Sequence, residues 1–246
     1  MVQQSSVRLI HALTSNRKAL ETSMLAPPDL TEIDAVVFDM DGTLIDSEGH
    51  YCQAYIHCMV SLGGSLEEEE YYQRFAGMTD DAIDECLQAE LPDPVDLSTI
   101  RGTWRQEYER RRHAQGVSML PGARELLDLL ATHSMPLAVA SAADLSEITV
   151  TLDLAGIRER FHSLSSGTEV PKTKPAPDVY LLAAERLGVK PTRCLAFEDT
   201  NSGTRAAIAA GLHTYMVPHR CEADRFIRKH AKGIANSLTE IVEALC

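Results

Sequence analysis

Two aspartates follow directly after an apolar segment near the start of the expected fold. Asp39 and Asp41 come after residues 33–38, and Gly42 and Thr43 follow them. In an extended chain, residues i and i+2 point to the same side, so the two carboxylates should converge at the end of a strand. Two like charges this close are unfavourable unless a cation lies beside them or one carboxyl is protonated. Both arrangements are used in catalysis.

Further polar side chains lie at or just beyond the ends of other short apolar segments. They are Ser141, Lys174, and the pair Glu198 and Asp199. In an open parallel sheet, ligands bind beyond the carboxyl ends of the strands, so we expect these side chains to meet the two aspartates at one edge. Carboxylate oxygens there suit Mg²⁺, which prefers carboxylates, waters and a substrate phosphate. Ser141 stands directly before an expected helix N-terminus, which would bind an anion, and the Lys174 ammonium could neutralise a phosphate oxygen.

Each of these groups also has an ordinary structural explanation. An Asp-x-Asp sequence is often a turn followed by a helix cap, and a serine at a strand end is usually an N-cap. A lysine before Pro175 usually lies in a surface loop, and Glu198 with Asp199 could cap the next helix. The shared position of all four groups at strand ends favours a single site.

Short apolar segments alternate with helical patterns from residue 33 onward. The expected strands cover residues 33–38, 137–141, 161–164, 194–198 and 213–217. Continuous apolar segments suit strands that are buried on both faces. Helical patterns lie between them, after Pro121 and at residues 146–155, 177–187 and 201–210. The alternation predicts an α/β fold, with a Rossmann-like core whose mainly parallel sheet is flanked by helices.

Residues 48–116 interrupt this alternation with helical patterns and no convincing strand. We expect them to form an all-helical cap domain inserted into an α/β core domain of residues 31–47 and 117–246. Residues 1–30 precede the core as an N-terminal extension. Their basic and serine residues weakly resemble a transit peptide, but a frayed or short helical extension is the simpler interpretation.

The charge and cysteine content limit the expected partners and location. A formal net charge of -13 gives an acidic surface that repels nucleic acid and anionic membranes, so neither is an expected partner. The six cysteines form no Cys-x-x-Cys pair and are typical of free thiols in a reducing compartment, so we expect a cytoplasmic protein. No apolar segment is long enough to cross a bilayer. We expect a monomer or a weak dimer.

Four short motifs, in this order along the chain, resemble those of the haloacid dehalogenase superfamily: FDMDGTLIDSE, ASAAD, KPAPD and FEDTNSG. The similarity covers residues 33–217 and points to the branch of phosphatases and β-phosphoglucomutase-like proteins with a helical cap after the first motif. It implies a Mg²⁺-dependent phosphatase that acts on a small-molecule phosphate ester, a sugar phosphate-like monoester. Hydrolysis would pass through an aspartyl-phosphate intermediate.

The resemblance also implies a role for each matching residue. Asp39 would be the nucleophile that takes the phosphoryl group, and Asp41 would be the general acid and base. Ser141 and Lys174 would hold the transferring phosphoryl group. The Mg²⁺ ligands would be Asp39, Asp41 through its backbone carbonyl, Glu198 and Asp199. A carboxylate nucleophile splits one slow hydrolysis into two faster steps, and a proton donor needs a raised pKa for the first of them.

Additional substrate contacts are implied beside the phosphoryl group and in the cap. Beside the phosphoryl group they are Gly42, Thr43 and Ala142, and in a cap loop they are Arg74 and Thr79. Thr79 or Asp80 could instead cap the helix that runs through Leu87.

Two positions distinguish hydrolysis from the phosphomutase reaction of the same branch. β-Phosphoglucomutases carry a histidine and an arginine where this chain has Tyr51 and Asp80. Asp80 would repel the second phosphate of a bisphosphate intermediate, so we expect water to be the phosphoryl acceptor. A β-phosphoglucomutase-like phosphomutase is the alternative, and a non-catalytic regulatory domain of the same fold is a further alternative from a different class.

Overall fold

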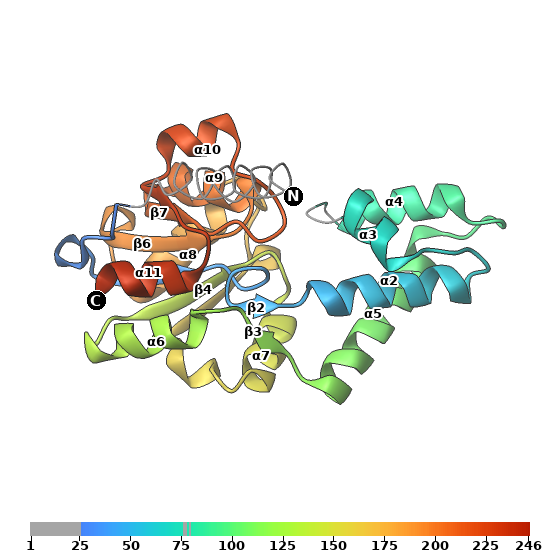
Figure 1. Cartoon of the computed structure of the whole chain (residues 1–246), viewed down its shortest axis with the longest axis horizontal. Helices are drawn as coiled ribbons and strands as arrows, with labels where there is room; N and C mark the ends of the chain where they lie inside the picture. The colour runs from blue at the N-terminus through green and yellow to red at the C-terminus, as the bar shows by residue number, and fades with distance from the viewer. Residues whose placement is uncertain (1–25, 76–77, 79) are drawn as a thin grey trace, which may run out of the picture.

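Strand β1 (Ala35–Phe38) carries an apolar side chain at each of its four positions, and all are buried. It lies inside a six-stranded sheet in the computed structural model, which describes residues 26–75, 78 and 80–246 (Figure 1). The strand order is β5 (Ser163–Ser166), β4 (Leu137–Ser141), β1, β6 (Cys194–Glu198), β7 (His213–Met216) and β8 (Gly233–Ile234). Neighbouring strands are parallel, so their carboxyl ends share one edge. The predicted α/β fold with a mainly parallel sheet is confirmed.

The side chains of β1 alternate between two apolar layers, one on each face of the sheet. Val36 and Phe38 pack into the first layer, whereas Ala35 and Val37 pack into the second. The first layer is covered by helices α6 (Ala123–Thr132), α7 (Leu145–Leu154) and α11 (Leu238–Leu245), and the second by α8 (Asp178–Leu187) and α9 (Asn201–Ala210). Each fully buried valine or phenylalanine contributes about 1.5–3 kcal/mol to folding, so this double burial fixes where β1 ends.

Shorter elements complete the core. Helix α10 (Arg225–His230) packs on α9. The 3₁₀ helices are η1 (Leu30–Glu32), η2 (Arg158–Arg160), η3 (Gly167–Glu169) and η4 (Pro191–Arg193).

Several predicted boundaries in the core agree with the structure, whereas β5 lies two residues later than the predicted 161–164. The strands at 137–141 and 194–198 and the helix at 201–210 have the predicted limits. Gly188 and Gly211 end their helices with φ of 68° and 90°, the left-handed conformation that glycine adopts readily. Strand β1 begins at residue 35 rather than 33, and β8 is absent from the prediction because two residues carry almost no periodic signal.

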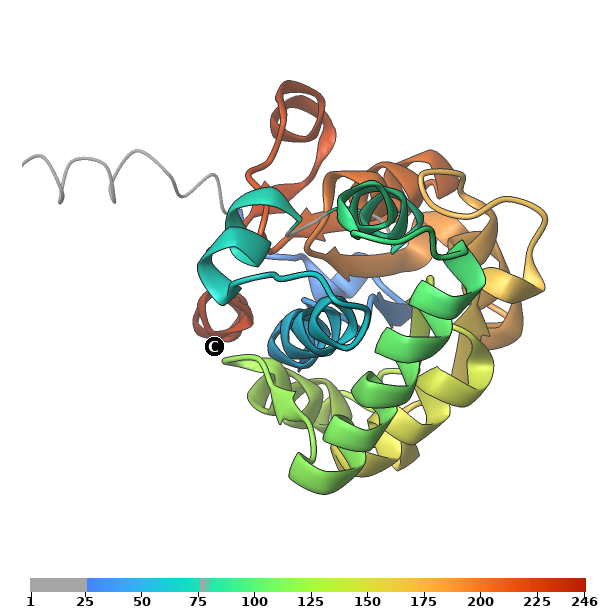
Figure 2. The same cartoon turned by 90° about the vertical axis from the view of Figure 1, so that its right-hand side faces the viewer.

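Four helices within residues 48–115 form a separate apolar cluster, with Trp104, Tyr55 and Leu87 among its buried members. These helices are α2 (Glu48–Ser61), α3 (Glu68–Arg74), α4 (Asp80–Glu90) and α5 (Leu97–Gln115). Figure 2 views the protein with these helices nearest the reader. The described residues of this region contain no strand, which agrees with the expected all-helical cap. The division into a cap domain and a core domain stays a prediction.

The two connections to these helices pair with each other. Strand β2 (Ile45–Asp46) and strand β3 (Ser118–Met119) form an antiparallel pair, and Nε2 of His50 lies 2.9 Å from the carbonyl oxygen of Gly116. Both strands are missing from the prediction, again because each has only two residues. Across the described part of the chain, no helix has the length and apolar character needed to span a membrane.

Candidate active site

The turn after β1 places Asp39 and Asp41 at the carboxyl edge of the sheet. The N–H of Asp39 donates to the carbonyl oxygen of Phe197 at 3.0 Å, which continues the pairing of β1 with β6. The turn closes through Gly42, whose N–H donates to the carbonyl oxygen of Ile45 at 2.8 Å. Gly42 has a φ of 80°, which residues with side chains rarely adopt. Sequence and turn together therefore fix both carboxylates at the strand end.

Lys174 joins the ends of β1 and β6. Its Nζ lies 2.5 Å from Oδ1 of Asp39 and 2.8 Å from Oε1 of Glu198. The lysine side chain is only 8% exposed, so solvent screens these ion pairs weakly. Lys174 is therefore not a surface-loop lysine, and the structure brings it together with Asp39 and Glu198 as expected.

Both carboxylate oxygens of Glu198 are engaged by protein groups. Besides Lys174, Oε1 accepts a hydrogen bond from the Tyr180 hydroxyl at 3.3 Å, and Oε2 accepts from the N–H and hydroxyl of Thr200 at 2.8 and 2.9 Å. Gly203 of α9 makes room for this carboxylate, because a β-carbon there would lie 1.5 Å from Oε1. Glu198 thus holds Lys174, and its role as a metal ligand stays a prediction.

The crowding of buried charges in this cluster shifts the pKa values of Asp39, Asp199 and Lys174. Burial raises the pKa of Asp39 to about 7, against the lowering effect of Lys174. Burial, followed by the charges of Glu198 and Asp39, raises the pKa of Asp199 well above its usual value. Burial opposes the charge of Lys174, but Asp39 and Glu198 outweigh it and raise its pKa. The cluster holds more negative charge than one lysine balances, and a bound cation would restore the balance.

The acid cluster has the oxygen atoms and the space that a metal ion needs. One carboxylate oxygen from each of Asp39, Glu198 and Asp199 lies within 4.8 Å of the others. Oδ1 of Asp199 is buried and has no hydrogen-bond partner among the described residues. A β-carbon at Gly42 would come within 2.2 Å of Oδ2 of Asp199, so glycine keeps this approach open. Buried oxygen ligands at this spacing suit a hard divalent cation.

Ser141 ends β4 beside β1, but its local structure differs from the prediction. Helix α7 begins at Leu145, and its N-cap is Asp144, whose side chain accepts from the N–H of Glu147. The Ser141 hydroxyl instead accepts from the N–H of Ala143 at 3.1 Å. The prediction that Ser141 stands directly before a helix is wrong, because the turn that its hydroxyl closes separates strand from helix.

The other residues expected around the phosphoryl group lie on the loops after β1 and β4. Thr43 is 1% exposed, and its hydroxyl has no hydrogen-bond partner among the residues that the structure describes. Ala142 is exposed on the loop that follows Ser141. The oxygen Oδ1 of Asp41 is also buried without such a partner within the described ranges. These unpaired polar atoms are available to a ligand, and the individual roles stay predictions.

The predicted cap contacts are not assembled at the acid cluster. Arg74 forms ion pairs with Glu70, one turn earlier on its own helix, and with Glu90 of α4. These pairs occupy its guanidinium, so the geometry gives no support to Arg74 as a substrate contact. Asp80 begins α4, and Thr79 lies outside the described residues.

Several residues that shape the site are absent from the prediction. Tyr180 and Thr200 hold Glu198, as described above, and a hydrogen bond from Ser47 opposes the rise that burial causes in the pKa of Asp41. Thr200 has a sequence signal, because it caps α9 directly after two acidic residues. Tyr180 and Ser47 have none, since only the folded chain brings them to their partners.

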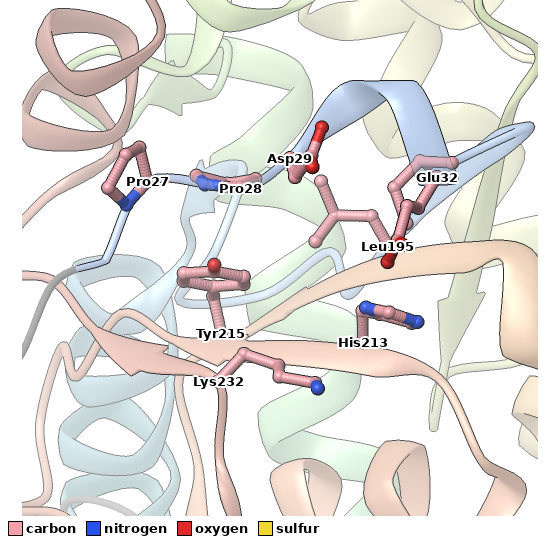
Figure 3. A pocket seen from close by; sticks show the side chains of 9 residues that line it. Pro27, Pro28, Asp29, Glu32, Leu195, His213, Tyr215 and Lys232 are labelled. Carbon is pink, nitrogen blue, oxygen red and sulfur yellow. The ribbon is translucent and has the colours of Figure 1, made fainter.

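A cavity of about 170 Å³ lies at the opposite end of the strands and is not part of this site. Leu195 and His213, near the beginnings of β6 and β7, line it together with Tyr215 and Lys232. Figure 3 shows these side chains facing the segment that carries Pro27, Pro28, Asp29 and Glu32. None of the acid-cluster residues lines this cavity.

The part of the chain that is similar to known proteins includes the residues of this site. The sequence model of the haloacid dehalogenase-like hydrolases matches residues 36–217. Hexitol phosphatase B of Escherichia coli (strain K12) is 34% identical over 223 residues, which cover 85% of this chain and 95% of that protein. A phosphorylated carbohydrates phosphatase of Thermotoga maritima is 32% identical over 190 residues, covering 76% of this chain and 86% of that protein.

A solved structure supports the same assignment. The crystal structure of a putative β-phosphoglucomutase from Thermotoga maritima aligns with a TM-score of 0.74 and 29% identity, over 87% of this chain and 98% of that one. The family match begins at the second residue of β1 and includes every later strand up to β7 and the residues of the acid cluster. The family expected from the four motifs is therefore confirmed, and the chain belongs to the haloacid dehalogenase-like hydrolases.

Proposed function

We propose that the protein is a Mg²⁺-dependent phosphatase that hydrolyses a sugar phosphate-like monoester through an aspartyl phosphate on Asp39. The observation that carries this proposal is the contact of Lys174 with Asp39 inside a buried group of three carboxylates. A nucleophile, a cation for the phosphate and a set of oxygen ligands for a metal thereby meet at one sheet edge. Relatives named as phosphatases of hexitols and phosphorylated carbohydrates support the substrate class.

In the first step, a carboxylate oxygen of Asp39 attacks the phosphorus of the ester. A bond forms between that oxygen and phosphorus while the bond from phosphorus to the leaving oxygen breaks. Asp41, protonated at this stage, gives its proton to the leaving oxygen. Burial raises the pKa of Asp41, which favours the protonated form that this step needs.

In the second step, water attacks the phosphorus of the aspartyl phosphate and Asp41 takes the proton of that water. The bond from phosphorus to Asp39 breaks, inorganic phosphate leaves and the carboxylate of Asp39 is restored. Lys174 neutralises charge on the phosphoryl oxygens in both steps. The hydroxyls of Ser141 and Thr43 would hold the phosphoryl group beside it.

Asp39 and Asp199, with the backbone carbonyl of Asp41, would bind Mg²⁺. The unpaired Oδ1 of Asp199 supports this assignment. The bound ion would offset the negative charge of the cluster and polarise the phosphoryl group toward attack. Glu198 would contribute indirectly, by holding Lys174 in position, because both of its carboxylate oxygens already accept hydrogen bonds from protein groups.

Hydrolysis is favoured over the phosphomutase reaction by two side chains of the helical region. Tyr51 and Asp80, the two positions that differ from β-phosphoglucomutases, line one small cavity together. The phosphomutase reaction needs a cationic side chain to bind the second phosphate of its bisphosphate intermediate, and Asp80 supplies a carboxyl group at this position instead. Water is therefore the proposed acceptor of the phosphoryl group.

Asp39→Asn should abolish release of inorganic phosphate from any accepted ester, lowering kcat by at least about 10⁴-fold, because the amide is not a nucleophile. Release of phosphate is measured on a panel of phosphate monoesters with Mg²⁺. Asp34→Asn is the matched control, since Asp34 is exposed and pairs with Arg193, and it should keep wild-type kcat. Full activity of Asp39→Asn would contradict the covalent mechanism. Robust conversion of glucose 1-phosphate to glucose 6-phosphate by the wild type would instead favour the mutase.

Asp199→Asn should weaken Mg²⁺ binding at least about tenfold, because it removes a charged oxygen ligand from a buried site. Titration calorimetry of Mg²⁺ into wild type and variant, without substrate, measures this directly. Asp128→Asn, at an exposed position on helix α6 where the carboxylate pairs with Arg160, is the control for the change in net charge. Equal Mg²⁺ affinity in wild type and Asp199→Asn would rule out the proposed ligand set.

Gly203→Ala should lower kcat/KM about 100-fold, because the new methyl group displaces Glu198 and with it Lys174. Gly102→Ala is the control: Gly102 lies inside α5, where a β-carbon meets nothing within 4 Å. Replacing a mid-helix glycine by alanine stabilises a helix by about 0.5–1 kcal/mol. This variant should therefore unfold at a slightly higher temperature and keep full activity. Wild-type kcat/KM in Gly203→Ala would show that Glu198 does not position Lys174.

A further inference from the structure

A small cavity lies between the helical region and the core, where side chains of α2, α4 and α5 meet the beginning of α7. Its volume of about 60 Å³ compares with an apolar protein cavity of about 150 Å³ that binds one benzene molecule. It therefore has room for a group of about two heavy atoms, such as a hydroxymethyl or carboxylate group, rather than for a whole sugar.

The cavity lies close to the carboxyl edge of the sheet, because Asp144 and Glu147, which line it, follow shortly after Ser141 at the end of β4. Burial and then the charge of Asp41 raise the pKa of Glu147 to about 7 and raise that of Tyr108 well above its usual value. Both residues line the cavity, and both feel the charge of Asp41, the proposed proton donor to the leaving oxygen. A leaving group whose oxygen is next to Asp41 can extend its far end into this space.

Acidic side chains dominate the cavity wall. The carboxyl groups of Asp80, Glu109, Asp144 and Glu147 line it, beside the guanidinium of Arg105. Burial raises the pKa values of Asp80 and Glu147, and Glu109 forms an ion pair with Arg112. Hydrogen bonds from Ser146 and from the N–H of Glu147 lower the pKa of Asp144, which keeps that carboxylate charged. An anionic group placed here would meet repulsion from several sides.

The wall also offers hydrogen bonds to an uncharged polar group. The Tyr108 hydroxyl is buried and has no hydrogen-bond partner among the described residues. Carboxylates accept hydrogen bonds from alcohols, and a hydroxyl group satisfies both kinds of partner at once. A terminal hydroxymethyl group fits this combination, whereas a carboxylate or a second phosphate does not.

Contacts between the helical region and α7 hold this wall in place. The Tyr51 hydroxyl donates to Oε1 of Glu147 at 3.2 Å, and Tyr51 stacks on Tyr108 with ring centroids 4.3 Å apart. On the next turn, Nη1 of Arg112 donates to Oγ1 of Thr151 at 2.8 Å. The position of the carboxylate of Glu147 is thus fixed from the opposite side of the cavity.

Building on the proposed phosphatase function, we propose that this cavity binds the far end of the leaving group. Glu147 and Asp144 are the specificity-determining residues. It selects phosphate monoesters of uncharged polyhydroxy compounds, whose chain ends in a hydroxymethyl group. It rejects esters whose chain ends in a carboxylate or a second phosphate.

Pairs of substrates that differ only at the far end test this proposal. Glucitol 6-phosphate ends in a hydroxymethyl group where 6-phosphogluconate ends in a carboxylate, and glycerol 3-phosphate and 3-phosphoglycerate form a shorter pair. Wild-type kcat/KM should favour the hydroxymethyl member of at least one pair by about tenfold or more, the size expected for one charge repelled at close range. Phosphate release at saturating Mg²⁺ and constant ionic strength gives the ratio.

Glu147→Gln and Asp144→Asn should each reduce this ratio severalfold. Glutamine can still accept from Tyr51, and asparagine is as good an N-cap as aspartate, so both variants should fold. Asp153→Asn, an exposed position on the same helix, is the control and should leave the ratio unchanged.

Equal kcat/KM for both members of the pairs, or a ratio that neither Glu147→Gln nor Asp144→Asn alters, would overturn the proposal. Hydrolysis of p-nitrophenyl phosphate without hydrolysis of any polyol ester would also overturn it while leaving the phosphatase function intact. Absence of hydrolysis with every ester, p-nitrophenyl phosphate included, would contradict the proposed function itself.

Discussion

The ammonium group of Lys174 lies between the carboxylates of Asp39 and Glu198, and the arrangement of the site depends on this contact. Burying several carboxylates together is costly unless a cation offsets their charge. Lys174 comes from the loop after β5, whereas the two acids end β1 and β6. One buried ammonium therefore ties the loop to two strands of the sheet and fixes the orientation of the proposed nucleophile.

Sheet order and two glycines make this contact possible. Strand β1 lies between β4 and β6, so the ends that carry Ser141, Asp39 and Glu198 are adjacent. Gly42 and Gly203 then let backbone pass close to Asp199 and Glu198, where any side chain would collide with a carboxylate. The same region combines charge, dense packing and unpaired oxygens, a combination that costs stability and is typical of functional sites.

The strands and the acid cluster could be predicted from the sequence because their signals are local. Continuous apolar segments ending in Asp39, Ser141 and Glu198 mark buried parallel strands, and parallel order alone brings their ends together. The two-residue strands β2 and β3 could not be predicted, since pairing across more than 70 residues defines them. The ion pair of Arg74 with Glu90 could not be predicted for a related reason, because it depends on how two helices pack, and a substrate role for Arg74 stays a prediction.

The stereochemical course at phosphorus tests the central claim, transfer through Asp39, most directly. A substrate ester with a phosphorus made chiral by oxygen isotopes and sulfur is hydrolysed, and the configuration of the released thiophosphate is determined. Each in-line displacement inverts the configuration, so two successive displacements, first by Asp39 and then by water, predict overall retention. Inversion would mean that water attacks the ester directly and would contradict the account.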